Sequence, residues 1–182
     1  MAVTQIITIP NKILTQKSPK IKYIDKDIQE TAQNLKDTLA QAKNPEGAGI
    51  SAPQIGKSIR LVVVKRFLSS PTDPGKVASE DIVLINPKII STSKETNSDW
   101  EACLSVPDTY GKVQRFEKIK VFAQDLLGNK IKIKATGFFA RIIQHEIDHL
   151  DGILFTSRVK GEVLTEKQLD ELLKKEHLET PE

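Results

Sequence analysis

The stretch that most constrains this chain of 182 residues is Gln144–Gly152, which holds two of its three histidines. His145 and His149 are four residues apart, and an α-helix places side chains at that spacing on one face, about a turn apart. Two imidazoles so placed can bind one metal ion. Glu146 is turned about 100° from His145, so its carboxylate can reach a water on that ion. The pattern H-E-x-x-H is typical of metal-dependent hydrolases.

The residues around this motif predict a helix that is buried in the core. Apolar side chains cover much of its circumference: Phe138, Phe139, Ile142, Ile143, Ile147 and Leu150. A solvated helix rich in Glu and His could carry the same five-residue pattern by chance. Buried ionisable groups need partners, however, and this helix carries several of them. The apolar flanks therefore favour a metal site.

Length and composition predict one domain over residues 1–182, with a single core. The sequence has no run of 18 or more apolar residues, so we expect no contact with a membrane. The first residues lack the pattern of a secretory signal, and we therefore expect a cytoplasmic protein. The formal net charge is +3 and the lysines form no dense block, which predicts no DNA partner.

Hydrophobic periodicity predicts an α+β fold, with short and mostly antiparallel strands around the central metal-binding helix. An extended arm over residues 1–24 precedes an N-terminal helix at 25–42, which Asp25 or Asp27 can cap. A C-terminal helix is expected at about 165–178, where Thr165 and Gln168 have the spacing of a capping box.

Alternating or β-branched apolar residues predict the strands. Short strands are expected at 59–64, 82–85, 88–90 and 113–116. A hairpin is expected over 119–135, with its turn at Gly128-Asn129. Residues 69–80 and 94–99 are polar and are expected to form loops.

Cys103 is the best candidate for a third metal ligand, because catalytic sites of this kind usually take three protein ligands. It is the only cysteine, so it cannot form a disulfide within the chain. A thiolate binds a soft or borderline metal ion strongly. Glu171 and Glu176 are alternatives, but both fall in the expected C-terminal helix and look solvated.

Gln54 belongs to a segment, Gly47–Gly56, whose glycines and proline predict an unusual backbone path. The segment does not end in Gly-Lys-Ser/Thr and no helix pattern follows it, so it is not a phosphate-binding loop. The residues alone leave two interpretations of Gln54 open: a solvent-facing loop residue, or a member of the site.

Three segments, in this order along the chain, resemble the three motifs of the peptide deformylase family: Gly47–Gln54, Glu101–Ser105 and Gln144–His149. The resemblance extends from the N-terminal arm to about Phe155. It implies a hydrolase of protein biosynthesis that removes the N-formyl group from the N-terminal formylmethionine of newly made polypeptides. Nascent formylated polypeptides would be its partners, and association with the ribosome is left open.

The resemblance also implies the metal and the catalytic roles. Cys103, His145 and His149 would bind Fe²⁺, with Zn²⁺ or Ni²⁺ as substitutes in preparations. A metal-bound water would be the nucleophile, with Glu146 as its general base. The remaining implied catalytic groups stabilise the oxyanion: the side-chain amide of Gln54 and the backbone N–H of Leu104.

Supporting and substrate-binding residues follow from the same resemblance. Glu101 and Arg115 are expected to pair and to hold the cysteine segment, and Asp148 to hydrogen-bond a ligand histidine or a nearby backbone group. The peptide is expected to run along the chain at Gly49 and Ile50, as a strand added to a sheet edge. The expected substrate-binding residues are Ala48, Gly49, Ile50, Ala102, Phe138 and Ile142.

The chain departs from the family pattern at three positions. Ser51 and Ala102 stand where the family usually has alanine and glycine, and Arg141 stands where it often has an apolar residue. Two other functions stay open on the sequence. One is an H-E-x-x-H metallopeptidase, which needs no cysteine ligand, and the other is a non-catalytic, deformylase-like peptide binder.

Overall fold

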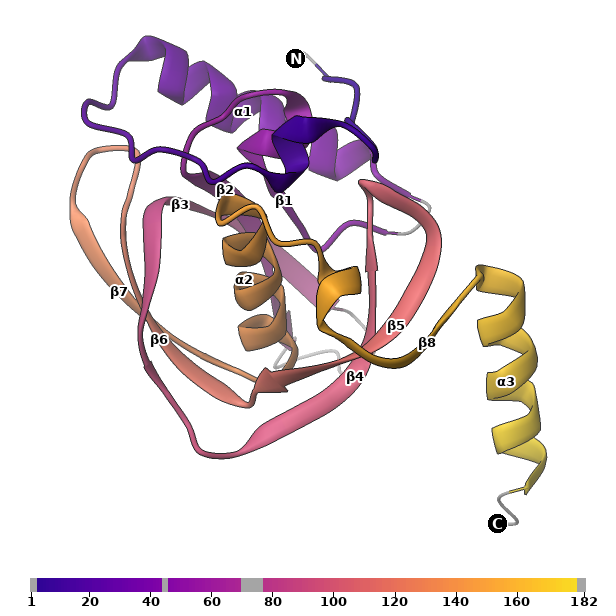
Figure 1. The fold of residues 1–182 in the computed structure, drawn as a ribbon. Helices are drawn as coiled ribbons and strands as arrows, with labels where there is room; N and C mark the ends of the chain where they lie inside the picture. Colours follow the sequence, from indigo (N-terminus) through magenta and orange to yellow (C-terminus); the bar gives the residue numbers. More distant parts are fainter. Residues whose placement is uncertain (1–2, 44–45, 70–76, 180–182) are drawn as a thin grey trace.

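The computed structural model describes residues 3–43, 46–69 and 77–179, and within these ranges it has the predicted α+β architecture. Helix α2 (Gly137–Leu150) lies at the centre, with strands of two antiparallel sheets around it (Figure 1). This arrangement confirms the expectation that the H-E-x-x-H helix is the buried centre of the fold.

The strands form one sheet of five and one of three. The larger sheet has the order β1-β2-β3-β6-β7, with the bounds Gly49–Ser51, Leu61–Ser69, Val77–Thr92, Lys118–Gln124 and Lys130–Thr136. The smaller sheet has the order β4-β5-β8, with the bounds Thr96–Cys103, Val106–Phe116 and Val159–Leu164. Three 3₁₀ turns complete the described chain: η1 (Lys12–Thr15), η2 (Ala52–Ile55) and η3 (Phe155–Arg158).

Two further helices occupy the positions that the sequence predicts. Helix α1 (Lys26–Gln41) begins after Asp25, whose side chain accepts a hydrogen bond from the Ile28 N–H at 3.1 Å. Its apolar face packs on the larger sheet, on the side away from α2. Helix α3 (Glu166–Glu179) starts at the predicted capping box and extends away from the body of the molecule (Figure 1).

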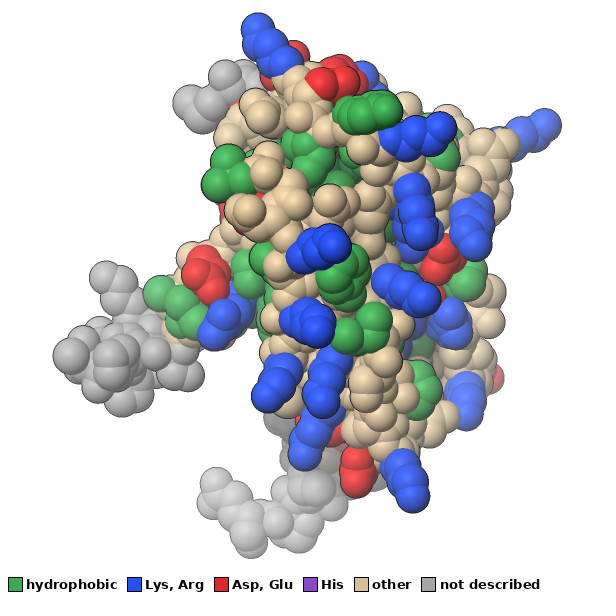
Figure 2. Space-filling model, turned by 90° about the vertical axis from the view of Figure 1, so that its left-hand side faces the viewer, with side chains coloured by type: hydrophobic (Ala, Val, Ile, Leu, Met, Phe, Trp, Pro, Cys, Tyr) green, Lys and Arg blue, Asp and Glu red, His purple; other side chains and the backbone are tan. Residues whose placement is uncertain are grey.

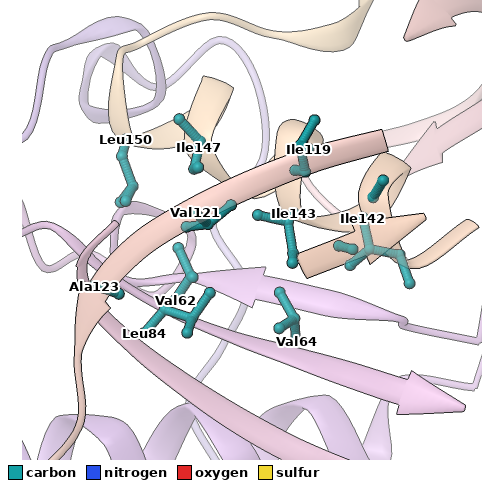
Figure 3. Close-up of a cluster of buried hydrophobic side chains, with 12 residues drawn as sticks. Val62, Val64, Leu84, Ile119, Val121, Ala123, Ile142, Ile143, Ile147 and Leu150 are labelled. Carbon is teal, nitrogen blue, oxygen red and sulfur yellow. The ribbon is translucent and has the colours of Figure 1, made fainter. Parts of the chain in front are cut away.

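Helix α2 is fixed by a cluster of apolar side chains between it and the larger sheet (Figure 3). The strands contribute alternate residues, because successive side chains of a strand point to opposite faces. The labelled members of the cluster are Val62, Val64, Leu84, Ile119, Val121, Ala123, Ile142, Ile143, Ile147 and Leu150. Their burial sets the position of the histidine face of the helix against the smaller sheet.

Two predictions about strands are wrong. The segments 82–85 and 88–90 belong to one strand, β3, in which the ladder shifts register around Asn86 instead of ending. Asn86 has a φ of 52°, and its side chain bonds both the N–H and the carbonyl of Ile21, at 2.9 and 2.8 Å. These side-chain bonds replace strand-to-strand hydrogen bonds that are missing at the register shift, so the strand continues through Pro87.

The prediction of a loop at 94–99 is also wrong from Thr96 onward, because β4 begins there. The polar residues of this segment are exposed, since β4 is an outer strand of its sheet. Of the loop expected over 69–80, residue 69 belongs to β2 and 77–80 to β3, while 70–76 lie outside the described residues. None of the helices described is both long enough and apolar enough to cross a membrane.

Candidate metal centre

Three predicted ligands come together from two elements. Cys103 ends strand β4, while His145 and His149 lie on one face of α2. Their ligand atoms all lie within 4.8 Å of one another, and the Cys103 Sγ is 3.2 Å from the His149 Nε2. One thiolate and two imidazoles are a donor set that suits a borderline divalent ion and leaves a fourth position open. The residues present therefore fit a metal ion.

Glu101 sets the tautomer of His145. The His145 Nδ1 lies 3.0 Å from the Glu101 Oε2, and a carboxylate can only accept, so Nδ1 carries the proton. The Nε2 lone pair of His145 is then directed to the metal centre. We expected Asp148 to bond a ligand histidine or the backbone, and this is wrong. Asp148 lies on the part of α2 that faces two arginines, Arg115 and Arg158, and its oxygens accept from both.

Glu101 and Arg115 pair as expected, with two hydrogen bonds of 2.9 Å. Burial of the Glu101 carboxyl would raise its pKa. The hydrogen bonds and charges of Arg115 and His145 outweigh that effect, and they hold the pKa of Glu101 far below its usual range. Glu101 is therefore ionised at neutral pH, and it anchors β4 beside Cys103.

Arg141 is a supporting residue that the sequence reasoning missed. Its guanidinium donates to the Glu101 Oε1 at 2.7 Å, to the Val113 carbonyl at 2.8 Å and to the Asn97 carbonyl at 2.9 Å. The charge is paired and the side chain is buried, so Arg141 joins α2 to both β4 and β5. A signal was present, because Arg141 precedes His145 by four residues and shares its helix face.

Glu146 is buried next to the backbone of β1. Its Oε2 has no hydrogen-bond partner among the described residues, and burial raises the pKa of the carboxyl to about 7. A Cβ added at Gly49 would lie 2.7 Å from the Glu146 Oε1. Only glycine leaves the carboxylate its present place, which explains why the first motif needs a glycine there.

Gln54 is buried and belongs to the site, which removes its interpretation as a solvent-facing loop residue. It lies in η2, and its Oε1 accepts from both the N–H and the hydroxyl of Ser51, each at 2.8 Å. The amide nitrogen then points to the Cys103 Sγ, at 3.7 Å. Ser51, one of the departures from the family pattern, thus adds a second donor that fixes the orientation of this amide.

The two histidines differ in their electrostatics. Burial alone would lower the pKa of His145, but hydrogen bonds with Cys103 and Glu101 and the charges of Cys103 and Glu146 raise it to about 10. Burial and the neighbouring charge of His145 hold the pKa of His149 well below its usual range. In the metal-free chain, His145 therefore carries a proton that a metal ion must displace.

A cavity of about 180 Å³ opens beside the three ligands. The predicted substrate-binding residues that line it are Ala48, Gly49, Ala102, Phe138 and Ile142. Ile50 is fully buried in the core under α1 and does not line the cavity, although its strand, β1, is at the edge of the larger sheet. Leu104 also lines the cavity, together with Gly47 of the first motif and two residues that no pattern singled out, Glu46 and Trp100.

Comparison with known sequences identifies relatives of the whole body of the fold. The family model described as polypeptide deformylase matches residues 3–164, which ends just before α3. Peptide deformylase 2 of Gloeobacter violaceus is 40% identical over 166 residues, or 91% of this chain and 84% of that protein. Peptide deformylase 2 of a Nostoc species is 41% identical over 173 residues, or 93% and 94% of the two chains.

Solved structures agree with these sequences. A peptide deformylase from Synechococcus elongatus in complex with actinonin superimposes with a TM-score of 0.76 at 33% identity, covering 94% of this chain and 85% of that one. A peptide deformylase from Acinetobacter baumannii with bound Met-Ala-Ser gives a TM-score of 0.76 at 33% identity, covering 87% and 99%.

Proposed function

This chain belongs to the peptide deformylase family, a family of metal-dependent hydrolases that remove N-formyl groups, and from that premise we propose which of its residues do so. The observation that carries the proposal is the convergence of all three motifs on one cavity. Cys103, His145 and His149 supply the metal ligands, and Glu146 and Gln54 reach the same place from different elements. The functional unit is one domain, residues 1–182.

The proposed metal is Fe²⁺, held by the Cys103 thiolate and the two imidazoles, and Zn²⁺ or Ni²⁺ can replace it in preparations. A divalent ion there supplies Lewis acidity, which polarises the formyl carbonyl and lowers the pKa of water from 15.7 towards about 7. The bond from Glu101 keeps His145 in the tautomer that binds metal. A thiolate site is sensitive to oxidation, which fits a reducing compartment and hence the cytoplasm.

Glu146 acts as the general base in this proposal. Its unpartnered oxygen accepts the proton of the attacking water, and the same carboxyl then gives that proton to the departing amine. The raised pKa of Glu146 suits both halves of this transfer, because the group is neither strongly acidic nor permanently protonated near neutral pH.

Two donors stabilise the negative charge that develops on the formyl oxygen. One is the Gln54 amide nitrogen, which Ser51 holds in a fixed orientation. The other is the backbone N–H of Leu104, the residue that follows Cys103 in the cavity wall. Preorganised donors of this kind cost no reorganisation during the reaction, and each is worth about 3 kcal/mol.

The substrate is a formylated peptide, by this proposal the N-terminus of a newly made polypeptide. Its methionine side chain packs against the apolar wall made by Ala48, Phe138 and Ile142. Its backbone pairs with the edge of β1 at Gly49 and Ile50, because β1 has β2 as its neighbour on one side and ends the described sheet on the other. On the opposite side of the cavity, the methyl group of Ala102 takes up space that the glycine usual in the family would leave free.

The Cys103→Ser variant separates this function from the H-E-x-x-H endopeptidase. We expect wild-type protein to release formate from formyl-Met-Ala-Ser, and the variant to lose that activity together with its metal, because the thiolate is one of three ligands. The measurement is formate release with metal analysis of both proteins. Cleavage of internal peptide bonds that survives in the variant would favour the endopeptidase. Binding of the peptide without formate release, in the metal-loaded wild type, would favour the non-catalytic binder.

A further inference from the structure

The outer face of strands β3, β6 and β7 carries a set of exposed lysines, here called the lysine face. Its members are Lys88, Lys118, Lys120, Lys130, Lys132 and Lys134. In β6 and β7 these lysines alternate with residues that pack toward α2, so the two strands present lysine outward and apolar side chains inward. Figure 2 shows this side of the molecule, on which Lys and Arg side chains gather.

Strand pairing concentrates these charges. Lys120 lies directly opposite Lys134, while Lys88 and Lys132 lie on either side of Phe122, in successive strands. Neighbouring strands are only about 4.8 Å apart, so charges that are scattered in the sequence become one patch. We expected no basic cluster because the lysines form no dense block along the sequence. That criterion misses a cluster that only strand pairing brings together.

The fold does not account for the lysine face. Like charges directly opposite one another destabilise a sheet. Lysines on an edge strand discourage aggregation, which explains the lysines of β7, because β7 is the last strand of the sheet. That explanation does not cover Lys118 and Lys120, because their strand, β6, is an interior strand between β3 and β7. Within the described part of the chain, none of the six lysines takes part in an ion pair.

We propose that the lysine face binds the phosphate backbone of RNA. Lysine is a flexible point charge that suits phosphate, and a row of such charges on a regular sheet binds without reading sequence. A membrane surface fits less well, because stable membrane anchoring takes a second signal in addition to a basic patch, and Phe122, which lies between the lysines, is half-buried. The choice of RNA over DNA rests on the proposed function, since a newly made polypeptide leaves a particle that consists largely of RNA.

The lysine face lies away from the metal-site cavity, so RNA bound to it would not block catalysis. None of its residues lines the metal-site cavity, which lies between β1, the end of β4 and the histidine face of α2. The lysines point away from α2, on the other surface of the larger sheet. RNA bound there leaves the cavity open to a peptide.

Fluorescence anisotropy with a labelled RNA hairpin tests the proposal directly. Wild-type protein should bind with an affinity that falls linearly on a logarithmic salt scale. The triple variant Lys120→Gln, Lys132→Gln, Lys134→Gln should bind at least about tenfold more weakly, with a salt slope lower by about three. The matched control Lys12→Gln, Lys17→Gln, Lys174→Gln removes the same charge from exposed positions elsewhere and should stay within about twofold of the wild type.

Three results would overturn the proposal: equal losses in the two triple variants, no salt-dependent binding by the wild type, or binding to phosphatidylserine vesicles without binding to the hairpin. Amide chemical shifts of the wild type give a second measurement that needs no variant. Addition of the hairpin should shift β6 and β7 residues, and shifts confined to other elements would contradict the assignment. Formate release, measured separately on the same proteins, reports on the proposed function and not on RNA binding.

Discussion

At the scale of single residues, the side-chain amide of Gln54 has the most informative environment. Its oxygen is fully used by two donors of Ser51, so its nitrogen has one direction available, toward Cys103. In the proposed mechanism, the site therefore does not rely on chance rotation of this side chain to present a donor to the formyl oxygen. The backbone N–H of Ser51 would supply one of these bonds whatever side chain stood at that position.

Gln54→Ala should reduce kcat about 10²- to 10³-fold, because it removes a donor that acts on the transition state. The circular dichroism spectrum and metal content should stay as in the wild type. Ser51→Ala is the matched control. It removes one of two orienting hydrogen bonds, worth about 1 kcal/mol, and should cost no more than about tenfold. Equal kcat in Gln54→Ala and the wild type would exclude Gln54 from the mechanism.

His145 makes metal binding depend on pH. Its pKa of about 10 in the metal-free chain means that a proton must leave before the imidazole can bind a cation. Affinity for Zn²⁺ should therefore rise between about pH 6 and pH 8, and calorimetry in buffers of different ionisation enthalpy should detect proton release. An affinity that is constant over this range, with no proton released, would show that the histidine is already neutral.

At the scale of elements, α2 and the smaller sheet are joined by one buried ionic network. Glu101 on β4 accepts from Arg115 on β5, and from Arg141 and His145 on α2. Asp148, one turn along the helix, accepts from Arg115 and from Arg158 of η3. The network therefore sets the distance between the cysteine on the sheet and the histidines on the helix.

Glu101→Gln should lower the free energy of unfolding by about 3 to 5 kcal/mol, because it leaves buried guanidinium groups without their carboxylate. Urea unfolding of the metal-free protein measures this. Glu80→Gln is the control: its pair with Arg66 is exposed and should contribute less than about 1 kcal/mol. If both variants unfolded at the same urea concentration, the network would have no structural role.

The same variant gives a pH signature. The pKa of Glu101 is lowered in the folded state, so its contribution is fully present above the unfolded value near 4.5 and declines as the pH falls below it. Wild-type stability should therefore drop more steeply in acid than that of Glu101→Gln. Parallel curves for the two proteins would show that the folded and unfolded pKa values of Glu101 are alike.

At the scale of the molecule, sequence patterns predicted the three helices, whose apolar residues recur with a local period. The spacing of His145 and His149 fixes a shared helix face, and a lone thiol was the chemically suitable third ligand. Contacts between elements were beyond such patterns. A period identifies the helix face on which Asp148 lies but not the residues that it contacts. Asp148 was therefore expected to bond a ligand histidine or the backbone, whereas it pairs with two arginines and Glu101 lies beside His145. Asn86 resembled a strand end because its unusual backbone bonds are visible only in three dimensions.

The lysine face shows the same limit in a different form. Its residues are scattered in the sequence between Lys88 and Lys134, and only the pairing of β3, β6 and β7 brings them together. Helix α3 lies beyond the part of the chain that the family model matches, and none of its side chains that the structure describes lines the metal-site cavity. The catalytic body and the outer surfaces are thus separate parts of the molecule, and each can be tested without disturbing the other.

The central claim is that Glu146 moves the proton during deformylation at a Cys-His-His metal centre. Formate release from formyl-Met-Ala-Ser by the wild type and by Glu146→Gln, at equal measured metal content, tests it most directly. The account predicts that the variant keeps its metal and its fold and loses about 10²- to 10⁴-fold in kcat. A fully loaded Glu146→Gln protein that releases formate at the wild-type rate would contradict it.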